Sequence, residues 1–243
     1  PLQQLTGEIT SSPAALFDPK PAYRFQPVSS TMQFFPEPSF GKDSPYGASV
    51  HYWLAKENDS IQLVIKDNEG NIVRTLKEKG KPGINRVWWD LRGDPTEKIV
   101  FRTKPRYANW YPLSEDRTRK SKTVPFSILQ PPGTYTIELV ADGKTFSKEL
   151  VILKDPHSEG SLGDIIEQTT LLKQLYAEMN IVTSEINKIE KIRRQLLDMK
   201  TMLKSVKDKK EVLTAIDSIH NSFLTLENKM VQLKVTGTGQ DDI

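Results

Sequence analysis

The sequence predicts a two-part chain of the α+β class, in which an immunoglobulin-like β-sandwich precedes an antiparallel coiled-coil helical hairpin. Residues 46–157 predict the sandwich, because they contain several short runs in which apolar and polar residues alternate. Residues 161–236 predict the hairpin, because their apolar residues recur at alternating spacings of three and four. The chain has 243 residues, of which 37% are hydrophobic, and this is enough to bury a sizeable core.

Residues 1–45 are predicted to form a proline-rich extended segment that packs on the sandwich. Proline removes backbone donors and favours polyproline or edge conformations, so no sustained helix or strand is expected here. The segment also carries aromatic residues that are too numerous for a free tail: Phe17, Tyr23, Phe25, Phe34, Phe35 and Phe40. We expect these rings to pack on the sandwich or on a domain outside this chain.

Two tight turns predict β-hairpins within the sandwich. The alternating runs 60–67 and 71–77 are joined by Asn68-Glu69-Gly70, and a second pair of runs meets at Asp142-Gly143. These residue types tolerate the positive φ that tight hairpin turns require. Residues 98–127, between the hairpins, are expected to form a long insertion in the sandwich.

Trp88 and Trp89 are neighbours in a run that alternates like a strand, so their side chains must point to opposite faces. Trp89 shares a face with Val87 and Leu91 and is predicted to fill the core. Trp88 is predicted to be covered by the proline-rich segment or by the insertion. The alternative is that Trp88 stacks on a sugar.

The predicted hairpin combines one helix of about 42 residues with a second of about 24 residues. The first begins at a capping pair, Ser161 with Asp164, and the second at a similar pair, Asp208 with Glu211. The predicted apolar seams are Leu172, Leu175, Met179, Val182, Ile186, Ile189, Ile192, Leu196, Met199, Leu203 and Val206 in the first helix, and Val212, Ile216, Ile219, Phe223, Leu226, Met230 and Leu233 in the second. Residues 237–243 are predicted to be a flexible tail.

The second helix is too short to cover the first turns of the longer one. Residues 164–180 therefore need another cover, and Leu171, Leu175 and Tyr176 are candidate partner-surface residues. The cover can be the β-domain, a further helix or a second molecule, which would make a homodimer through the hairpin.

A series of motifs occurs in an order that resembles a known family: LFDPKPAYRF, SPYGASVHYWL, DNEGNIVRTL, GINRVWWDLR, FRTKP and PPGTYTIELVADGKTFSKELVILKDP, before the helical hairpin. They resemble the C-terminal region of bacterial sortilin-type β-propeller proteins, often called glycosyl-hydrolase-like or exo-sialidase-like. The β-part is also similar to the immunoglobulin-like domain of flagellar hook-capping proteins.

The resemblance implies that residues 1–45 lead out of a propeller and that more helix follows Ile243. It also implies a parent protein that is exported to the periplasm, the cell surface or the extracellular space. Any catalytic residues of such a parent lie in its propeller, so none are assigned to this chain.

The insertion at 98–127 is the stretch most suggestive of binding, because it interleaves basic and aromatic residues. Its candidate binding residues are Arg102, Arg106, Tyr107, Trp110 and Tyr111. Together with Trp53 and Trp88, the aromatic rings can stack on carbohydrate. The favoured interpretation is a long loop whose aromatic rings pack down while its charges remain in water.

No residue pattern indicates catalysis or metal binding. The histidines His51, His157 and His220 have no metal-ligand spacing, and cysteine is absent. The run DNEGN at 67–71 lacks the glycine and the distant glutamate of a calcium loop, so it is interpreted as a hairpin turn. Phosphate-loop, nucleophile-elbow and zincin motifs do not occur. We therefore expect no enzyme activity, metal or cofactor.

The formal net charge of +3 does not indicate a nucleic-acid partner, and no apolar run is long enough to span a membrane. We expect a non-catalytic structural or interaction module whose partner is another protein or its parent's own propeller. The first alternative is a carbohydrate-binding module. The second is an accessory part of a glycoside hydrolase whose active site lies in the propeller.

Overall fold

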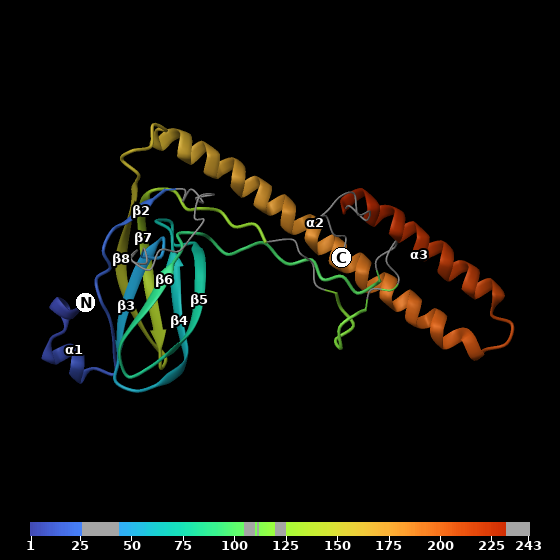
Figure 1. Ribbon diagram of the computed structural model, residues 1–243, viewed down its shortest axis with the longest axis horizontal. Helices are drawn as coiled ribbons and strands as arrows, with labels where there is room; N and C mark the ends of the chain where they lie inside the picture. Colours follow the sequence, from blue (N-terminus) through green and yellow to red (C-terminus); the bar gives the residue numbers. More distant parts are fainter. Residues whose placement is uncertain (26–43, 105–109, 111, 120–124, 232–243) are drawn as a thin grey trace, which may run out of the picture. The chain divides into compact units, whose positions relative to one another are not determined.

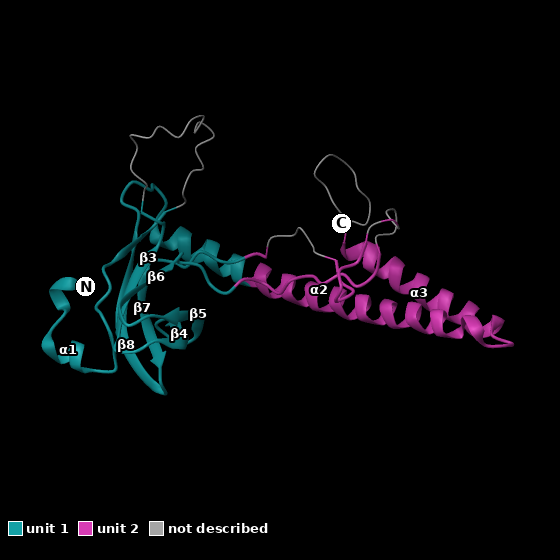
Figure 2. Cartoon of the chain, turned by 60° about the horizontal axis from the view of Figure 1, so that its bottom comes forward, with its two compact units in different colours: residues 1–94, 127–173 teal, residues 95–126, 174–243 magenta. Residues whose placement is uncertain are grey.

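The computed structural model describes residues 1–25, 44–104, 110, 112–119 and 125–231 (Figure 1). It shows the predicted mixture of α and β structure, with a three-stranded sheet, a five-stranded sheet, one long helix and one shorter helix. The chain divides into two compact units, residues 1–94 with 127–173 and residues 95–126 with 174–243 (Figure 2). The insertion therefore groups with the helices, whereas the predicted division placed it with the sandwich.

The three-stranded sheet belongs to the first unit and has the order β1-β3-β6. It consists of β1 (Ala14–Leu16), β3 (Ala48–Leu54) and β6 (Gly83–Trp89), and both pairings are antiparallel. Buried and half-buried residues alternate without interruption along β3. One face of the sheet therefore lies in a core, as the alternation predicted.

The five-stranded sheet has the order β2-β8-β7-β4-β5. Its strands are β2 (Ala22–Arg24), β4 (Asn58–Lys66), β5 (Ile72–Gly80), β7 (Gly133–Ala141) and β8 (Lys144–Lys154). All pairings are antiparallel except that of β2 with β8.

Both predicted β-hairpins are present. Asp142 and Gly143 join β7 to β8 with φ values of 49° and 73°, which is the geometry of a tight hairpin turn. Between β4 and β5, the Asp67 carboxylate accepts hydrogen bonds from the backbone N–H groups of Glu69 and Asn71. The DNEGN run is therefore a hairpin turn, as predicted.

Residues from both sheets contribute to one hydrophobic core. Its largest fully buried side chains include Trp89, Tyr52, Leu63 and Leu139. The Trp89 indole N–H donates to the carbonyl of Arg92 at 2.8 Å, and its ring packs edge-on against Tyr135. Trp89 thus fills the core as predicted, with its polar atom satisfied.

The first 25 residues contain short regular elements where an extended segment was predicted. A 3-10 helix, η1 (Leu2–Gln4), and a short helix, α1 (Gly7–Ser11), precede β1 and β2. Phe17 is buried, whereas Tyr23 and Phe25 are 51% and 43% exposed. The predicted aromatic contacts of Phe34, Phe35 and Phe40 lie outside the described residues.

The long helix α2 (Leu162–Met202) has 41 residues and the shorter helix α3 (Lys210–Met230) has 21, close to the predicted lengths. A short 3-10 helix, η2 (Leu203–Ser205), follows α2. Ser161 and Asp164 form the predicted reciprocal cap, in which each side chain accepts from the other residue's backbone N–H. The second cap was predicted wrongly, because the residue that precedes α3 is Lys209, whose side chain makes no cap hydrogen bond, and Asp208 has a φ of 53°.

The packed face of α3 differs from the predicted apolar seam. Ile216 is buried as predicted, but Val212, Ile219 and Leu226 are 46–48% exposed. Glu227 is instead buried, and His220 is half-buried. The apolar periodicity predicted a helix here, but it did not determine which of two neighbouring faces of α3 packs against the rest of the unit. Within the described part of the chain, no helix has the length and hydrophobicity needed to cross a membrane.

Candidate functional site

Residues 95–126, here called the strap, form an excursion whose two ends lie together. The Thr96 N–H donates to the Phe126 carbonyl at 2.7 Å, and the Phe126 N–H donates to Thr96 Oγ1 at 3.0 Å. Thr96 is only 5% exposed, so this clip is shielded from water. The strap therefore leaves and returns at one point, although about thirty residues separate its ends.

The strap is bound to α2 by polar side chains of the helix. Asn180 Oδ1 accepts from the Glu97 N–H at 2.9 Å. Two turns further along the same face, Asn187 accepts from the Val100 N–H at 2.8 Å and donates to the Lys98 carbonyl at 3.1 Å. An extended backbone cannot satisfy its own donors, so these amide side chains act as its hydrogen-bonding partners.

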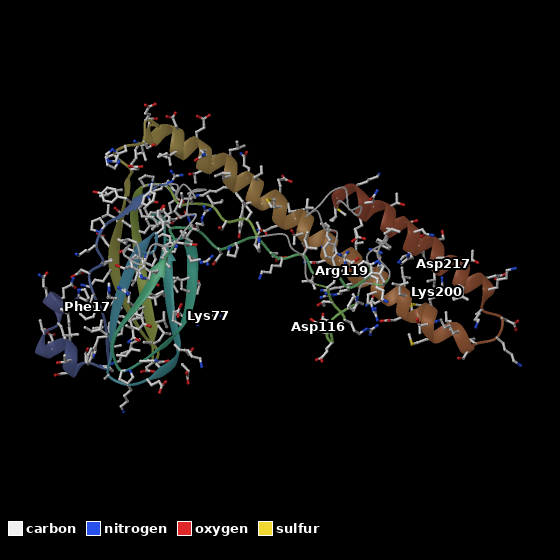
Figure 3. The ribbon with its side chains drawn as sticks, viewed as in Figure 1. Phe17, Lys77, Asp116, Arg119, Lys200 and Asp217 are labelled. Atoms are coloured by element: carbon white, nitrogen blue, oxygen red, sulfur yellow. The ribbon has the colours of Figure 1, made fainter. Side chains whose placement is uncertain are left out.

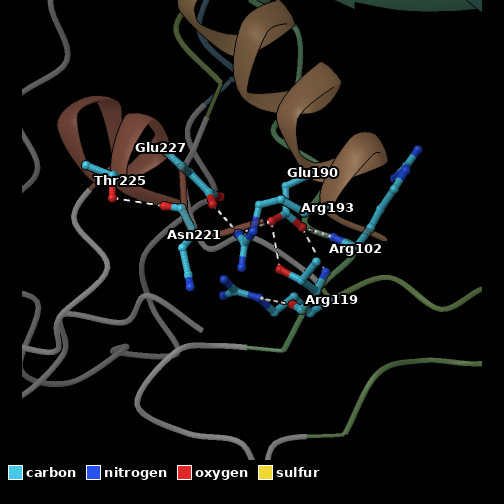
Figure 4. Close-up of polar contacts among 8 residues, drawn as sticks. Arg102, Arg119, Glu190, Arg193, Asn221, Thr225 and Glu227 are labelled. Carbon is cyan, nitrogen blue, oxygen red and sulfur yellow. Dashed lines mark hydrogen bonds and ion pairs between the residues drawn. The ribbon is translucent and has the colours of Figure 1, made fainter. Parts of the chain in front are cut away.

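Glu190 makes the most extensive of these contacts (Figure 4). Its carboxylate accepts from the backbone N–H groups of Arg102 and Thr103 and, at 2.7 Å, from the Thr103 hydroxyl. Glu190 is fully buried and Thr103 is 2% exposed. Charge-assisted hydrogen bonds in such a dry environment are among the stronger polar contacts that a protein makes.

The same Glu190 belongs to a buried ionic cluster with α3. Arg193 Nη1 donates to Glu190 at 2.7 Å and also to Glu227 (Figure 4). Arg193 is 5% exposed and Glu227 is fully buried. One guanidinium thus connects a helix α3 carboxylate to the carboxylate that holds the strap.

Burial controls the electrostatics of this cluster. It raises the pKa of Glu227 to about 7; the charge of Glu190 acts in the same direction, and Arg193 acts against both. Burial together with the Arg193 charge lowers the pKa of His220. Both effects favour uncharged forms of these two side chains near neutral pH.

More exposed ion pairs surround the cluster. Asp198 pairs with Arg117 of the strap at 2.5 Å and with Arg194 at 3.1 Å, and Lys200 pairs with Asp217 of α3 (Figure 3). Because these ion pairs are exposed, each contributes little to stability. Within the strap, the backbone N–H of Arg119 donates to the Phe101 carbonyl, and the Arg119 guanidinium lies 4.0 Å from the centre of the Phe101 ring.

A pocket of about 360 Å³ lies beside the cluster, with Lys104, Arg193, Arg194 and three leucines in its lining. Two of its arginines already have carboxylate partners, Arg193 in Glu190 and Arg194 in Asp198. Among the described residues, no group of three or more His, Asp or Glu side chains is arranged to hold a metal ion. The polar geometry of this unit therefore joins segments of the chain to each other.

The predicted binding residues are distributed between the two units. Trp53 and Trp88 are half-buried in the sheet unit, where the Trp53 indole N–H donates to the Ser12 carbonyl and the Arg86 guanidinium lies 5.6 Å from the Trp88 ring centre. In the other unit, Trp110 is 77% exposed, while the backbone of Arg102 binds Glu190. The predicted binding roles of Arg106, Tyr107 and Tyr111 lie outside the described residues.

The predicted partner surface on α2 is exposed at Leu171 and Leu175, which are 61% and 47% exposed. Tyr176 is half-buried, and its hydroxyl donates to the Pro95 carbonyl at 3.4 Å. The strap therefore supplies part of the cover that the sequence required for this stretch of α2.

Sequence reasoning missed the side chains that bind the strap. The signal was present, because Asn180 and Asn187 are seven residues apart and Glu227 falls between Phe223 and Met230 at coiled-coil spacing. Polar residues at such positions mark places where a helix meets something other than an apolar partner. Comparisons with protein-family models, curated proteins and solved structures found no match.

Proposed function

We propose that this chain is a non-catalytic structural and interaction module, the C-terminal part of a larger exported β-propeller protein. In this proposal the two sheets form an immunoglobulin-like sandwich, and α2 and α3 form an antiparallel coiled-coil hairpin. The partner is the parent's own propeller or another protein, and an exported parent places the module in the periplasm or at the cell surface.

One observation supports this proposal above others: the buried polar groups of the helical unit bind other parts of the same chain. Glu190 binds the backbone of the strap, and Arg193 joins Glu190 to Glu227. Groups arranged in this way have little capacity left for substrate. Their arrangement favours a rigid scaffold.

The size of the protein in its native host tests this proposal. An antibody against α3 should detect a species several times larger than the 27.6 kDa of this chain. Purification of that species under mild conditions should keep the α3 epitope and the propeller together. A single native species of 27.6 kDa would contradict the proposal, because the chain would then act alone.

Carbohydrate binding is a second candidate, favoured by the register of the three-stranded sheet. Ser49 pairs with Trp88, His51 with Arg86 and Trp53 with Ile84, so both tryptophans lie on the face opposite the core with polar groups between them. Two aromatic rings along one sheet face can stack on a glycan chain.

Titration with neutral and acidic oligosaccharides tests this candidate. Saturable binding that W88A abolishes and W110A preserves would assign the glycan to the sheet face. Binding lost only in W110A would assign it to the strap. No saturable binding at millimolar concentration would eliminate the candidate.

A further inference from the structure

Two buried carboxylates share one guanidinium where α3 meets α2. Glu190 and Glu227 are both fully buried, and both accept from Nη1 of Arg193 (Figure 4). If both carboxylates are ionised, this group of three carries one excess negative charge in a water-excluded contact. Such a charge is costly to bury, and a proton on one carboxyl group removes it.

The hydrogen bonds identify which carboxyl group takes the proton. Both oxygens of Glu190 accept hydrogen bonds, from Thr103 and Arg102 of the strap and from Arg193. Glu227 Oε1, in contrast, is buried and has no hydrogen-bond partner among the described residues. A carboxylate with several donors is stabilised in its charged form, whereas one with an unpaired buried oxygen is not.

We propose that Glu227 is a proton-operated latch that holds α3 against α2 when protonated and loosens the contact when ionised. Because Glu190 also binds the strap, the protonation state of Glu227 affects the stability of the whole helical unit. The unit is therefore more stable at mildly acidic pH than at alkaline pH.

Other charged groups near the latch modify this behaviour. Arg193 opposes protonation of Glu227. The buried guanidinium of Arg119, which donates to the Thr103 carbonyl, brings a second positive charge that acts in the same direction as Arg193 (Figure 4). His220 on α3 titrates in the opposite sense, because its charged form is disfavoured by burial and by Arg193. The Lys200–Asp217 pair joins the same two helices but is partly exposed, so it contributes little to the stability of the contact.

The sign of the effect follows from proton linkage. The pKa of Glu227 rises from 4.5 to about 7 when α3 is in place, so the docked state binds more protons between these values. Stability is then fully present below pH 4.5 and is lost as the pH rises through 7. The equilibrium constant for opening α3 should increase about 30-fold between about pH 5.5 and about pH 8.5.

Hydrogen exchange of the α3 backbone amides in the full chain measures this opening. Protection factors, corrected for the intrinsic pH dependence of exchange, should fall about 30-fold over this range in H220Q, in which the opposing histidine is removed. Adding E227Q, which mimics the protonated carboxyl group, to H220Q should abolish this fall. Adding D217N, which breaks the neighbouring exposed pair, to H220Q should leave the fall in place.

Two results would overturn the latch: pH-independent protection of α3 in H220Q, or an unchanged pH dependence when E227Q is added to H220Q. If E227Q does not fold, the carboxyl carbon of Glu227 in the unmodified chain can be titrated by NMR. A midpoint near 7 would support the latch, and a midpoint below about 5 would refute it.

Discussion

Trp88 and Trp89 are chemically identical neighbours with different surroundings. Trp89 is fully buried with its N–H bonded, whereas Trp88 is half-buried beside Arg86. Replacing Trp89 by Ala should lower the free energy of unfolding of the sheet unit by about 4 kcal/mol, because a large cavity forms. The matched W88A change should cost about 1 kcal/mol. Denaturant titrations of both variants measure the difference, and equal losses would contradict this assignment of the core face.

The sequence predicted the burial of Trp89 but not that of Glu227, because a strand pattern specifies a side chain's face more closely than a helix pattern does. On a strand the alternation of side chains leaves only two faces, so Val87 and Leu91 decide where Trp89 points. A helix surface is continuous, and an apolar residue shifted by one position belongs to a neighbouring stripe. Glu227 was overlooked because a buried carboxylate can be recognised only from the partner that neutralises it.

At the scale of elements, Gly47 permits β3 to begin beside β6. Its φ is +118°, and a Cβ at this position would lie 2.0 Å from the carbonyl oxygen of Trp89. The G47A change should therefore lower the free energy of unfolding by at least about 2 kcal/mol. Gly70 is the matched control, since its φ is also positive but nothing lies within 4 Å of an added Cβ.

Denaturant midpoints of the two glycine variants test this prediction. G70A should cost about 1 kcal/mol, from backbone strain alone. If G47A were no more destabilising than G70A, the close approach of β3 to Trp89 would be wrong.

In the helices, features that depend on nearby residues were predicted, whereas contacts between distant residues were not. The Ser161–Asp164 cap and the length of α2 follow from local chemistry, and both were predicted. The strap was expected to be a loop of the sandwich, because its sequence has no periodicity. Its true partners, Asn180, Asn187 and Glu190, lie more than eighty residues away along the chain. Pairings of that range leave little local signal.

In the whole molecule, the stability of the sheets should not depend on the strap. No described residue of the strap belongs to the hydrophobic core of the sheet unit, and the strap's ends are hydrogen-bonded to each other at Thr96 and Phe126. Replacing residues 98–124 by a short glycine-serine linker should leave unfolding of the sheet unit unchanged. The same deletion removes the strap donors of Glu190, so the helical unit should lose about 3 kcal/mol or more.

Circular dichroism distinguishes the two units in this deletion variant. The helical signal at 222 nm should melt at lower temperature, while the β-sheet amide signals in NMR spectra should keep their wild-type positions. A helical transition at the wild-type temperature would show that the strap does not stabilise α2.

Residue-resolved hydrogen exchange measures whether polar side chains of α2 hold the backbone of the strap. The amides of Val100 and Thr103 should be protected in the unmodified chain. N187A should release Val100 and E190A should release Thr103, whereas E185A, which changes an exposed glutamate, should release neither. Exchange of both amides at the rate of an unstructured peptide in the unmodified chain would mean that α2 does not hold the strap.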